Sequence, residues 1–179
     1  MVFRPTIMGT HGMVATEHYL SAFIGATILR QGGNAVDAAI AAIFAEGVVN
    51  PHMHTLGGEV PMLIAIAATG QVVALNGNTA APQRATIDWY TQHGMTLIPG
   101  EGLLAAGVPA ACDALLTALE RFGTMTLAEV LEPALDLASV GFPVHPGLRG
   151  PSDYLPYSIW HNQDKFRAQW PSSAQLYMP

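Results

Sequence analysis

The sequence is poor in charged residues and nearly free of cysteine. Only 11% of its 179 residues are Asp, Glu, Lys or Arg, whereas soluble domains usually carry about 25%. The single cysteine, Cys112, excludes an internal disulfide and a cysteine-rich zinc site. Because Cys112 lies in an apolar run, we expect a small buried side chain there rather than a nucleophile. So little charge predicts that another subunit, or more of a longer chain, covers part of the surface.

Positive charge and long apolar runs are also scarce. The seven Lys and Arg residues are scattered and the net charge is −6, so no basic patch for nucleic acid is expected. The apolar run 60–68 is too short for a membrane helix, which needs about 20 residues. The first residues lack the basic start and apolar core of a signal peptide. We therefore expect no nucleic-acid or membrane partner and a cytoplasmic location, with a periplasmic one left open.

Two helix boundaries are clearly marked in the first fifty residues. Apolar spacing predicts a helix over 17–31 that Thr16 caps, and Gly32 is the residue type that ends a helix. Asn34 then caps a second helix over 35–49. This second helix carries alanine on nearly every face, which predicts that it is buried between other elements.

A β-hairpin is expected next, with strands over 60–67 and 71–75 joined by a turn at Thr69-Gly70. The first strand is apolar almost throughout, which predicts that both faces of the sheet are covered. The remaining chain is mostly helical, with helices expected over 87–93, 110–122 and 127–140. Helices that surround one hairpin predict an α/β fold.

The histidines form one candidate site. His52 and His54 are two residues apart in a loop, and the other candidate ligands are His11, His18 and Glu59. A zinc or iron site needs three or four converging ligands, of which two histidines supply half at best. Metal binding and an ordinary polar loop therefore both stay open. We assign no metal and no other cofactor.

Two glycine motifs are candidate phosphate sites. Gly32-Gly33-Asn34 precedes a helix N-terminus, where an anion can bind, but it follows a helix rather than a strand and lacks the third glycine of a dinucleotide site. Leu56-Gly57-Gly58 lacks the lysine and serine of a phosphate loop. We interpret both as turns. No Gly-x-Ser-x-Gly element marks a nucleophilic serine either.

Seven motifs, in order, resemble one enzyme family. They are 12–15, 29–39, Asn50-Pro51 followed by 56–58, Ala81-Pro82, 107–110, 121–125, and 133–138 before Gly141-Phe142. The chain thus resembles the N-terminal part of the γ-glutamyltranspeptidase family over about residues 12–148. That family includes transpeptidases, glutathione hydrolases and acylases.

The resemblance implies an N-terminal-nucleophile hydrolase with an αββα sandwich, to which this chain contributes helices and a β-hairpin of the large subunit. Such precursors cleave themselves, and the new N-terminal threonine of the small subunit attacks an amide carbonyl to form an acyl-enzyme. Nothing in this chain matches that threonine, so no catalytic residue is assigned. Residues 1–179 are expected to be a single incomplete domain, inactive alone. The implied partners are a small subunit from the same precursor and a small-molecule amide substrate.

One position of the resemblance concerns specificity. The family's γ-glutamyl enzymes carry an arginine just before the Ala-Pro pair, and its guanidinium binds the α-carboxylate of the substrate. Aligned on Ala81-Pro82, this chain has Asn78 at that position. Losing a charge-assisted hydrogen bond weakens binding about tenfold to over a hundredfold. Arg84 could replace the arginine only if the loop were rebuilt.

These residues lead to a main hypothesis and to alternatives. The main hypothesis is an amidohydrolase or acylase of this family in which Asn78 alters the acyl specificity. A true glutathione hydrolase or γ-glutamyltransferase is the alternative within the family, and an ordinary turn residue is the competing interpretation of Asn78. A non-catalytic structural remnant is the alternative from another class.

Overall fold

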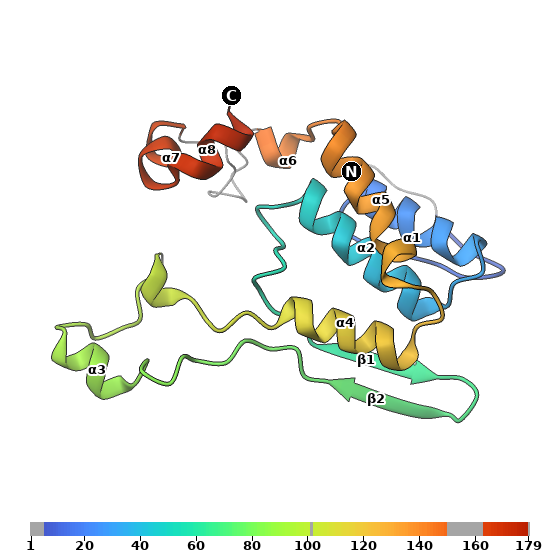
Figure 1. Ribbon diagram of the computed structural model, residues 1–179, viewed down its shortest axis with the longest axis horizontal. Helices are drawn as coiled ribbons and strands as arrows, with labels where there is room; N and C mark the ends of the chain where they lie inside the picture. Colours follow the sequence, from blue (N-terminus) through green and yellow to red (C-terminus); the bar gives the residue numbers. More distant parts are fainter. Residues whose placement is uncertain (1–5, 101, 150–162, 179) are drawn as a thin grey trace.

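The computed structural model describes residues 6–100, 102–149 and 163–178. Helices surround one two-stranded antiparallel sheet, in the α/β arrangement that the sequence predicts (Figure 1). The elements are α1 (Tyr19–Arg30), α2 (Ala35–Val49), β1 (Met62–Ile66), β2 (Gln71–Leu75), α3 (Ile87–Gln92), the 3-10 helix η1 (Leu103–Ala105), α4 (Ala111–Phe122), α5 (Leu127–Val140), α6 (Pro146–Arg149), α7 (Gln163–Gln169) and α8 (Pro171–Tyr177).

Helix α2 is the centre of the core, as its alanine-rich sequence predicts. It contacts α1, α4 and α5. Its Ala41 and Ala45 are fully buried, together with Leu115 of α4 and Val130 of α5. Small side chains on several faces let three helices approach one helix closely. The position of α2 is therefore dictated by its composition.

Helix α1 begins two residues later than predicted. Its N-cap is His18, whose Nδ1 accepts a hydrogen bond from the Leu20 N–H at 3.2 Å. The expected cap, Thr16, lies before this residue and donates its hydroxyl to the His18 carbonyl at 2.8 Å. The predicted end is confirmed, because Gly32 has φ +98° directly after the C-cap, a conformation that glycine adopts without strain.

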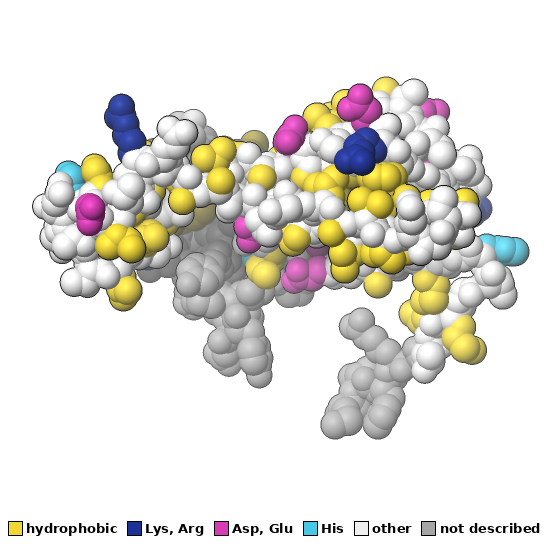
Figure 2. Space-filling view, turned by 90° about the horizontal axis from the view of Figure 1, so that it is seen from below, with side chains coloured by type: hydrophobic (Ala, Val, Ile, Leu, Met, Phe, Trp, Pro, Cys, Tyr) yellow, Lys and Arg dark blue, Asp and Glu magenta, His cyan; other side chains and the backbone are white. Residues whose placement is uncertain are grey.

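The hairpin is confirmed, with Met62 opposite Leu75 and Ile66 opposite Gln71. One face of the sheet packs on the helical core through Met62 and Leu75. The other face is open, since Leu63 is 78% exposed and Val72 is 66% exposed. Hydrophobic side chains are visible in patches when the molecule is viewed from below (Figure 2). The prediction that both sheet faces are covered is therefore wrong for this chain. An apolar strand sequence indicates that both faces favour burial, but it does not show that the same chain contains the segments that pack on both of them.

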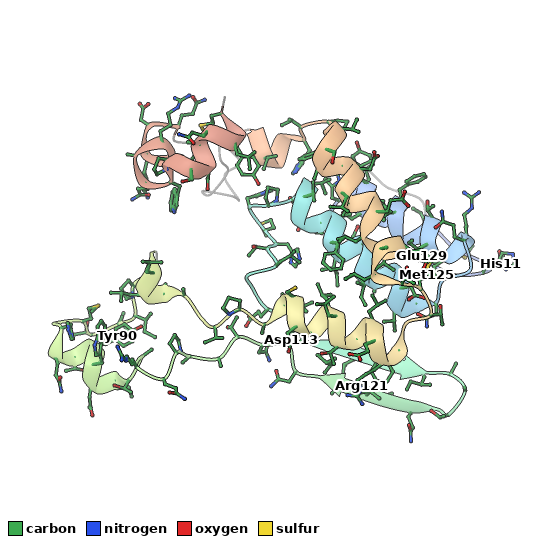
Figure 3. The ribbon with its side chains drawn as sticks, in the orientation of Figure 1. His11, Tyr90, Asp113, Arg121, Met125 and Glu129 are labelled. Atoms are coloured by element: carbon green, nitrogen blue, oxygen red, sulfur yellow. The ribbon has the colours of Figure 1, made fainter. Side chains whose placement is uncertain are left out.

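A groove of about 940 Å³ runs between α2 and β1. Its lining is mostly apolar and includes Val36 and Ile43 of α2 and Ile66 of β1, and Arg121 at the end of α4 also lines it (Figure 3). The groove and the open sheet face together leave much apolar surface uncovered within the described chain.

Residues 76–100 and 102–110 form an arm that extends away from the core and carries α3 and η1 (Figure 1). The two sides of the arm are joined by an antiparallel bridge between Ala80 and Val108. At its end, the Tyr90 hydroxyl donates to the Leu104 carbonyl at 2.7 Å and so ties α3 to η1. Thr86 caps α3 as predicted.

Helices α4 and α5 return the chain to the core. The α5 N-terminus is the predicted capping box, in which Thr126 and Glu129 bond reciprocally. Cys112, however, is exposed. The expectation that it is buried is wrong, because α4 turns the face with Ala111 and Leu115 to the core and leaves position 112 outside.

Within the described ranges, no helix has the length and hydropathy of a membrane span.

Candidate functional site

Asn78 lies directly beyond β2, at the base of the arm, and its side chain is exposed. Its amide Nδ2 donates to Asn76 Oδ1 at 2.8 Å, and its backbone N–H donates to the same oxygen at 3.3 Å. Asn76 Oδ1 therefore engages the backbone N–H of Asn78 and one of the two N–H groups of its side-chain amide. The other amide N–H and the amide oxygen of this exposed side chain are uncharged groups that a ligand can meet.

The chain on both sides of Asn78 is held rigidly. The Gly77 carbonyl accepts a hydrogen bond from the Val60 N–H at 2.9 Å. Gly77 is buried, and a Cβ there would collide with the Val60 carbonyl oxygen and lie 2.7 Å from Ala114 Cβ of α4. Close contact with backbone and with a helix therefore requires glycine at this position and fixes where Asn78 lies.

The charged group nearest in this network is acidic. Glu59 Oε2 accepts hydrogen bonds from the backbone N–H of Thr79 at 3.2 Å and from its hydroxyl at 3.1 Å. Arg84 does not take the place of the family's arginine here, because it lines a hollow in the arm with Trp89 and Leu104. The charged side chain in this network is thus a carboxylate, which repels an anionic ligand.

The Gly32-Gly33-Asn34 motif holds no open anion site. Asn34 Oδ1 accepts from the N–H groups of Val36 and Asp37 at 2.8 and 3.1 Å, and Asp37 Oδ2 accepts from the Asn34 N–H at 2.8 Å. The donors that would hold a phosphate at this helix end are therefore already bonded. The interpretation of the motif as a turn between two helices agrees with this geometry.

Asp37 also joins α2 to the loop before α5. The fully buried carboxylate accepts from the Thr124 N–H and hydroxyl, at 2.9 and 2.6 Å, and from the Met125 N–H at 3.1 Å. Met125 lies in this loop, two residues before α5 begins, and near the N-terminal end of α2 (Figure 3). Burial by itself raises the pKa of Asp37, but the hydrogen bonds from Thr124, Asn34 and Met125 outweigh burial and leave this pKa below its ordinary value.

The histidines are partly brought together. His18 and His52 both face His145, with ring centroids 4.9 and 5.7 Å from the His145 ring. Sequence reasoning missed His145, because it lies in a stretch without periodic pattern and far from the others along the chain. His11 is exposed, and Glu59 binds Thr79 instead. Among the residues that the structure describes, no three such side chains are arranged to hold a metal ion.

Residues 21–179 match the sequence profile of the family described as Gamma-glutamyltranspeptidase. The chain belongs to the gamma-glutamyltranspeptidase family. The predicted membership is thus confirmed, over a longer part of the chain than the motifs indicated.

Relatives described as a glutathione hydrolase and as an acylase are both similar to this chain. It is 35% identical over 146 residues to the glutathione hydrolase proenzyme of Bacillus subtilis (strain 168), covering 79% of this chain and 25% of the relative. It is 40% identical over 153 residues to the acylase ACY 1 proenzyme of Pseudomonas sp. (strain V22), covering 78% and 26%. The chain therefore spans about a quarter of the length of these relatives.

The fold agrees with solved structures of gamma-glutamyltranspeptidase members. The crystal structure of Helicobacter pylori gamma-glutamyltranspeptidase superposes with a TM-score of 0.71 at 35% identity, over 77% of this chain and 40% of that chain. The predicted fold class is confirmed: the chain supplies helices and a hairpin of the α/β fold of this N-terminal-nucleophile hydrolase family.

Proposed function

We propose that this chain is the N-terminal segment of the large subunit of a gamma-glutamyltranspeptidase-like amidohydrolase or acylase. In this proposal, residues 1–179 are one incomplete domain, and a small subunit from the same precursor carries the threonine that forms the acyl-enzyme. Two observations support it. The similar relatives are described as proenzymes, and the match to this chain covers about a quarter of their length. The groove along β1 and the outer face of the hairpin are apolar and uncovered within the described residues.

The contribution of this chain to the reaction is to position the Asn78 segment, rather than to supply the nucleophile. Gly77 packs against Val60 and α4 and so fixes the position of that segment relative to the core. Glu59 fixes Thr79 on the other side of Asn78. An acyl group bound there would meet the rigid Asn76–Asn78 pair, whose geometry is preset before substrate arrives.

The observation that carries the specificity is the hydrogen bond from Asn78 Nδ2 to Asn76 Oδ1 at 2.8 Å. A γ-glutamyl substrate needs a charged donor for its α-carboxylate, and here the donor is an uncharged amide, one N–H of which is already bonded to Asn76, with the acidic Glu59 bound to the next residue. We infer an acyl group without an α-carboxylate, as an acylase takes. The similarity to a glutathione hydrolase proenzyme supports the second candidate, which is a true γ-glutamyl enzyme.

Asn78→Arg in the full-length protein separates these two candidates. The guanidinium supplies the charge-assisted donors that asparagine lacks, so kcat/KM for a γ-glutamyl anilide should rise about tenfold to a hundredfold. The kcat/KM for an acyl anilide without the α-carboxylate should stay level or fall. Asn78→Gln is the matched control, because it keeps an uncharged amide and should gain nothing.

Two results would contradict the proposed specificity. One is a wild-type protein that turns over the γ-glutamyl anilide faster than the acyl anilide, and the other is an Asn78→Arg variant without improvement. Mass spectrometry of the full-length product tests the subunit proposal separately. Two fragments, the smaller one starting with threonine, are expected, whereas an uncleaved inactive product would favour a structural remnant.

A further inference from the structure

Three histidines from separate parts of the chain meet beside the C-terminal end of α2. We define the histidine cluster as His18 at the start of α1, His52 in the loop after α2, and His145 in the segment between α5 and α6. The ring centroids of His18 and His145 are 4.9 Å apart, and those of His52 and His145 are 5.7 Å apart. His145 is therefore the common member, and it lies between the other two.

The cluster connects the segment 142–149 to the core. His145 Nε2 lies 3.2 Å from the carbonyl oxygen of Val49, the last residue of α2. Because a carbonyl only accepts, the hydrogen of this bond must be on Nε2. The same segment continues into α6, where Leu148 packs with Met178 and the neighbouring aromatic rings. The contact of His145 with α2 thus helps to hold the C-terminal helices against the core.

Polar atoms around the cluster are buried without partners. His18 is only 5% exposed and Asn50 2% exposed. Among the residues that the structure describes, the buried side-chain atoms without a hydrogen-bond partner are His18 Nε2, Ser21 Oγ, Glu46 Oε2, Asn50 Oδ1, His52 Nδ1 and His54 Nε2. Buried polar groups without partners are rare in native proteins, and a concentration of them marks a place that is readily destabilised.

His18 has a hydrogen-bond role that depends on its being neutral. Its Nδ1 accepts from the Leu20 N–H and so caps α1. An imidazolium carries hydrogens on both nitrogens and has no acceptor left. Protonation of His18 therefore removes the cap and adds a positive charge at the positive end of the α1 dipole.

The charged and titratable neighbours do not offset this effect fully. Glu17 precedes α1 and Glu46 faces from α2, and both favour a charged ring. Burial and the neighbouring His145 lower the pKa of His18. Burial also lowers the pKa of His54, against the opposing effect of Glu46. The Tyr19 ring stacks on His18 at 4.7 Å. On balance, the pKa values of His18, His52 and His54 lie below the ordinary value, with burial as the largest cause.

We propose that the histidine cluster is an acid-sensitive joint, which holds the segment 142–149 against α1 and α2 while His18 and His52 are neutral and releases it when these two rings are protonated. A positive His18 ring is buried and, among the described residues, its Nε2 has no partner, and the α1 cap is lost in the same step. His18 and His52 each take up a proton on opening, so the joint opens over a narrower pH range than one histidine would give.

The direction of the pH dependence follows from proton linkage. Each ring whose pKa is lowered by folding binds its proton more readily in the unfolded or opened chain. The stabilisation is therefore complete above the ordinary histidine pKa of 6.5 and is lost as the pH falls below it. Each such ring changes the equilibrium constant for opening by at most about tenfold per pH unit in that range.

The test is the pH dependence of opening in the full chain. We compare wild type with His18→Asn/His145→Gln, in which Asn keeps the cap acceptor and Gln keeps a donor for Val49, although neither titrates. Urea unfolding midpoints between pH 5 and pH 8 should fall on acidification in wild type and fall much less in the double variant. His11→Gln is the matched control, since His11 is exposed at the edge of the molecule (Figure 3).

A local readout follows the segment itself. Hydrogen exchange, corrected for the intrinsic effect of pH, should show that residues 142–149 lose protection between pH 7.5 and pH 5.5, while α5 keeps it. NMR titration of the wild-type rings should give pKa values below 6.5 for His18 and His52, and this measurement needs no variant to fold. The proposal is overturned if the double variant keeps the wild-type slope, or if His18 and His52 titrate at or above pH 6.5.

Discussion

Replacement of Asp37 with asparagine is expected to lower the free energy of unfolding by about 3 kcal/mol. The carboxylate is fully buried and accepts from three backbone N–H groups and one hydroxyl. Asparagine has nearly the same shape but turns an NH₂ group toward these donors. Some of them then stay buried without an acceptor, and α2 loses its connection to the start of α5.

The pH dependence of the free energy of unfolding tests whether the Asp37 carboxylate causes this loss of stability. The hydrogen bonds hold the pKa of Asp37 below its ordinary value of 3.8, so the unfolded chain takes up this proton first on acidification. The stabilisation by Asp37 is therefore present above about pH 4 and is lost as the pH falls through the lowered pKa. The difference between wild type and Asp37→Asn should be full at pH 7 and should shrink below about pH 4.

Urea unfolding at pH 7 and at pH 3 measures both effects. Asp136→Asn is the matched control, because it removes the same charge from an exposed position on α5 and should change stability by less than about 0.5 kcal/mol. An equal loss in both variants would show that net charge, rather than the bonds to Thr124 and Met125, is responsible.

Gly77→Ala is expected to destabilise the chain by about 2–3 kcal/mol, because extra atoms in a packed site force backbone shifts. The new Cβ would meet the Val60 carbonyl oxygen and lie 2.7 Å from Ala114 Cβ. Neither is the far end of a flexible side chain, so the β2 end must move away from α4. The hydrogen bond from Val60 to Gly77 lengthens as a result.

This displacement should also reach Asn78. In the full-length protein we expect kcat/KM to fall more than the amount of folded protein does, since Asn78 is the next residue. Gly100→Ala is the matched control, because no atom of the described residues beyond its chain neighbours lies within 4 Å of its Cβ position. Normal unfolding midpoints for Gly77→Ala would contradict the close packing that the structure shows.

Local signals in the sequence were sufficient for much of the framework. The Asn34 cap, the Thr126–Glu129 capping box and the hairpin turn were all predictable, because each depends on residues within a few positions of one another. The α1 start was not, because Thr16 and His18 compete for the same helix end and the choice depends on how His18 is buried. The exposure of Cys112 likewise depends on which face α4 turns to the core.

The candidate site shows the same division. Asn78 was found by alignment on Ala81-Pro82, but its engagement by Asn76 and its proximity to Glu59 through Thr79 were not predictable. His52 was a candidate in the sequence, whereas His145 was not. A loop side chain carries no periodic signal, so its neighbours are unknown until the elements pack.

The sequence by itself thus determined the family, the order of the helices and hairpin, and the buried position of α2, since these follow from short-range spacing and composition. Only the tertiary structure decided that Asp37 bonds Thr124, that Glu59 fixes the residue after Asn78, and that His145 lies between His18 and His52. Those contacts join residues from 20 to over 80 positions apart. Their partners are selected by packing geometry, which no local pattern encodes.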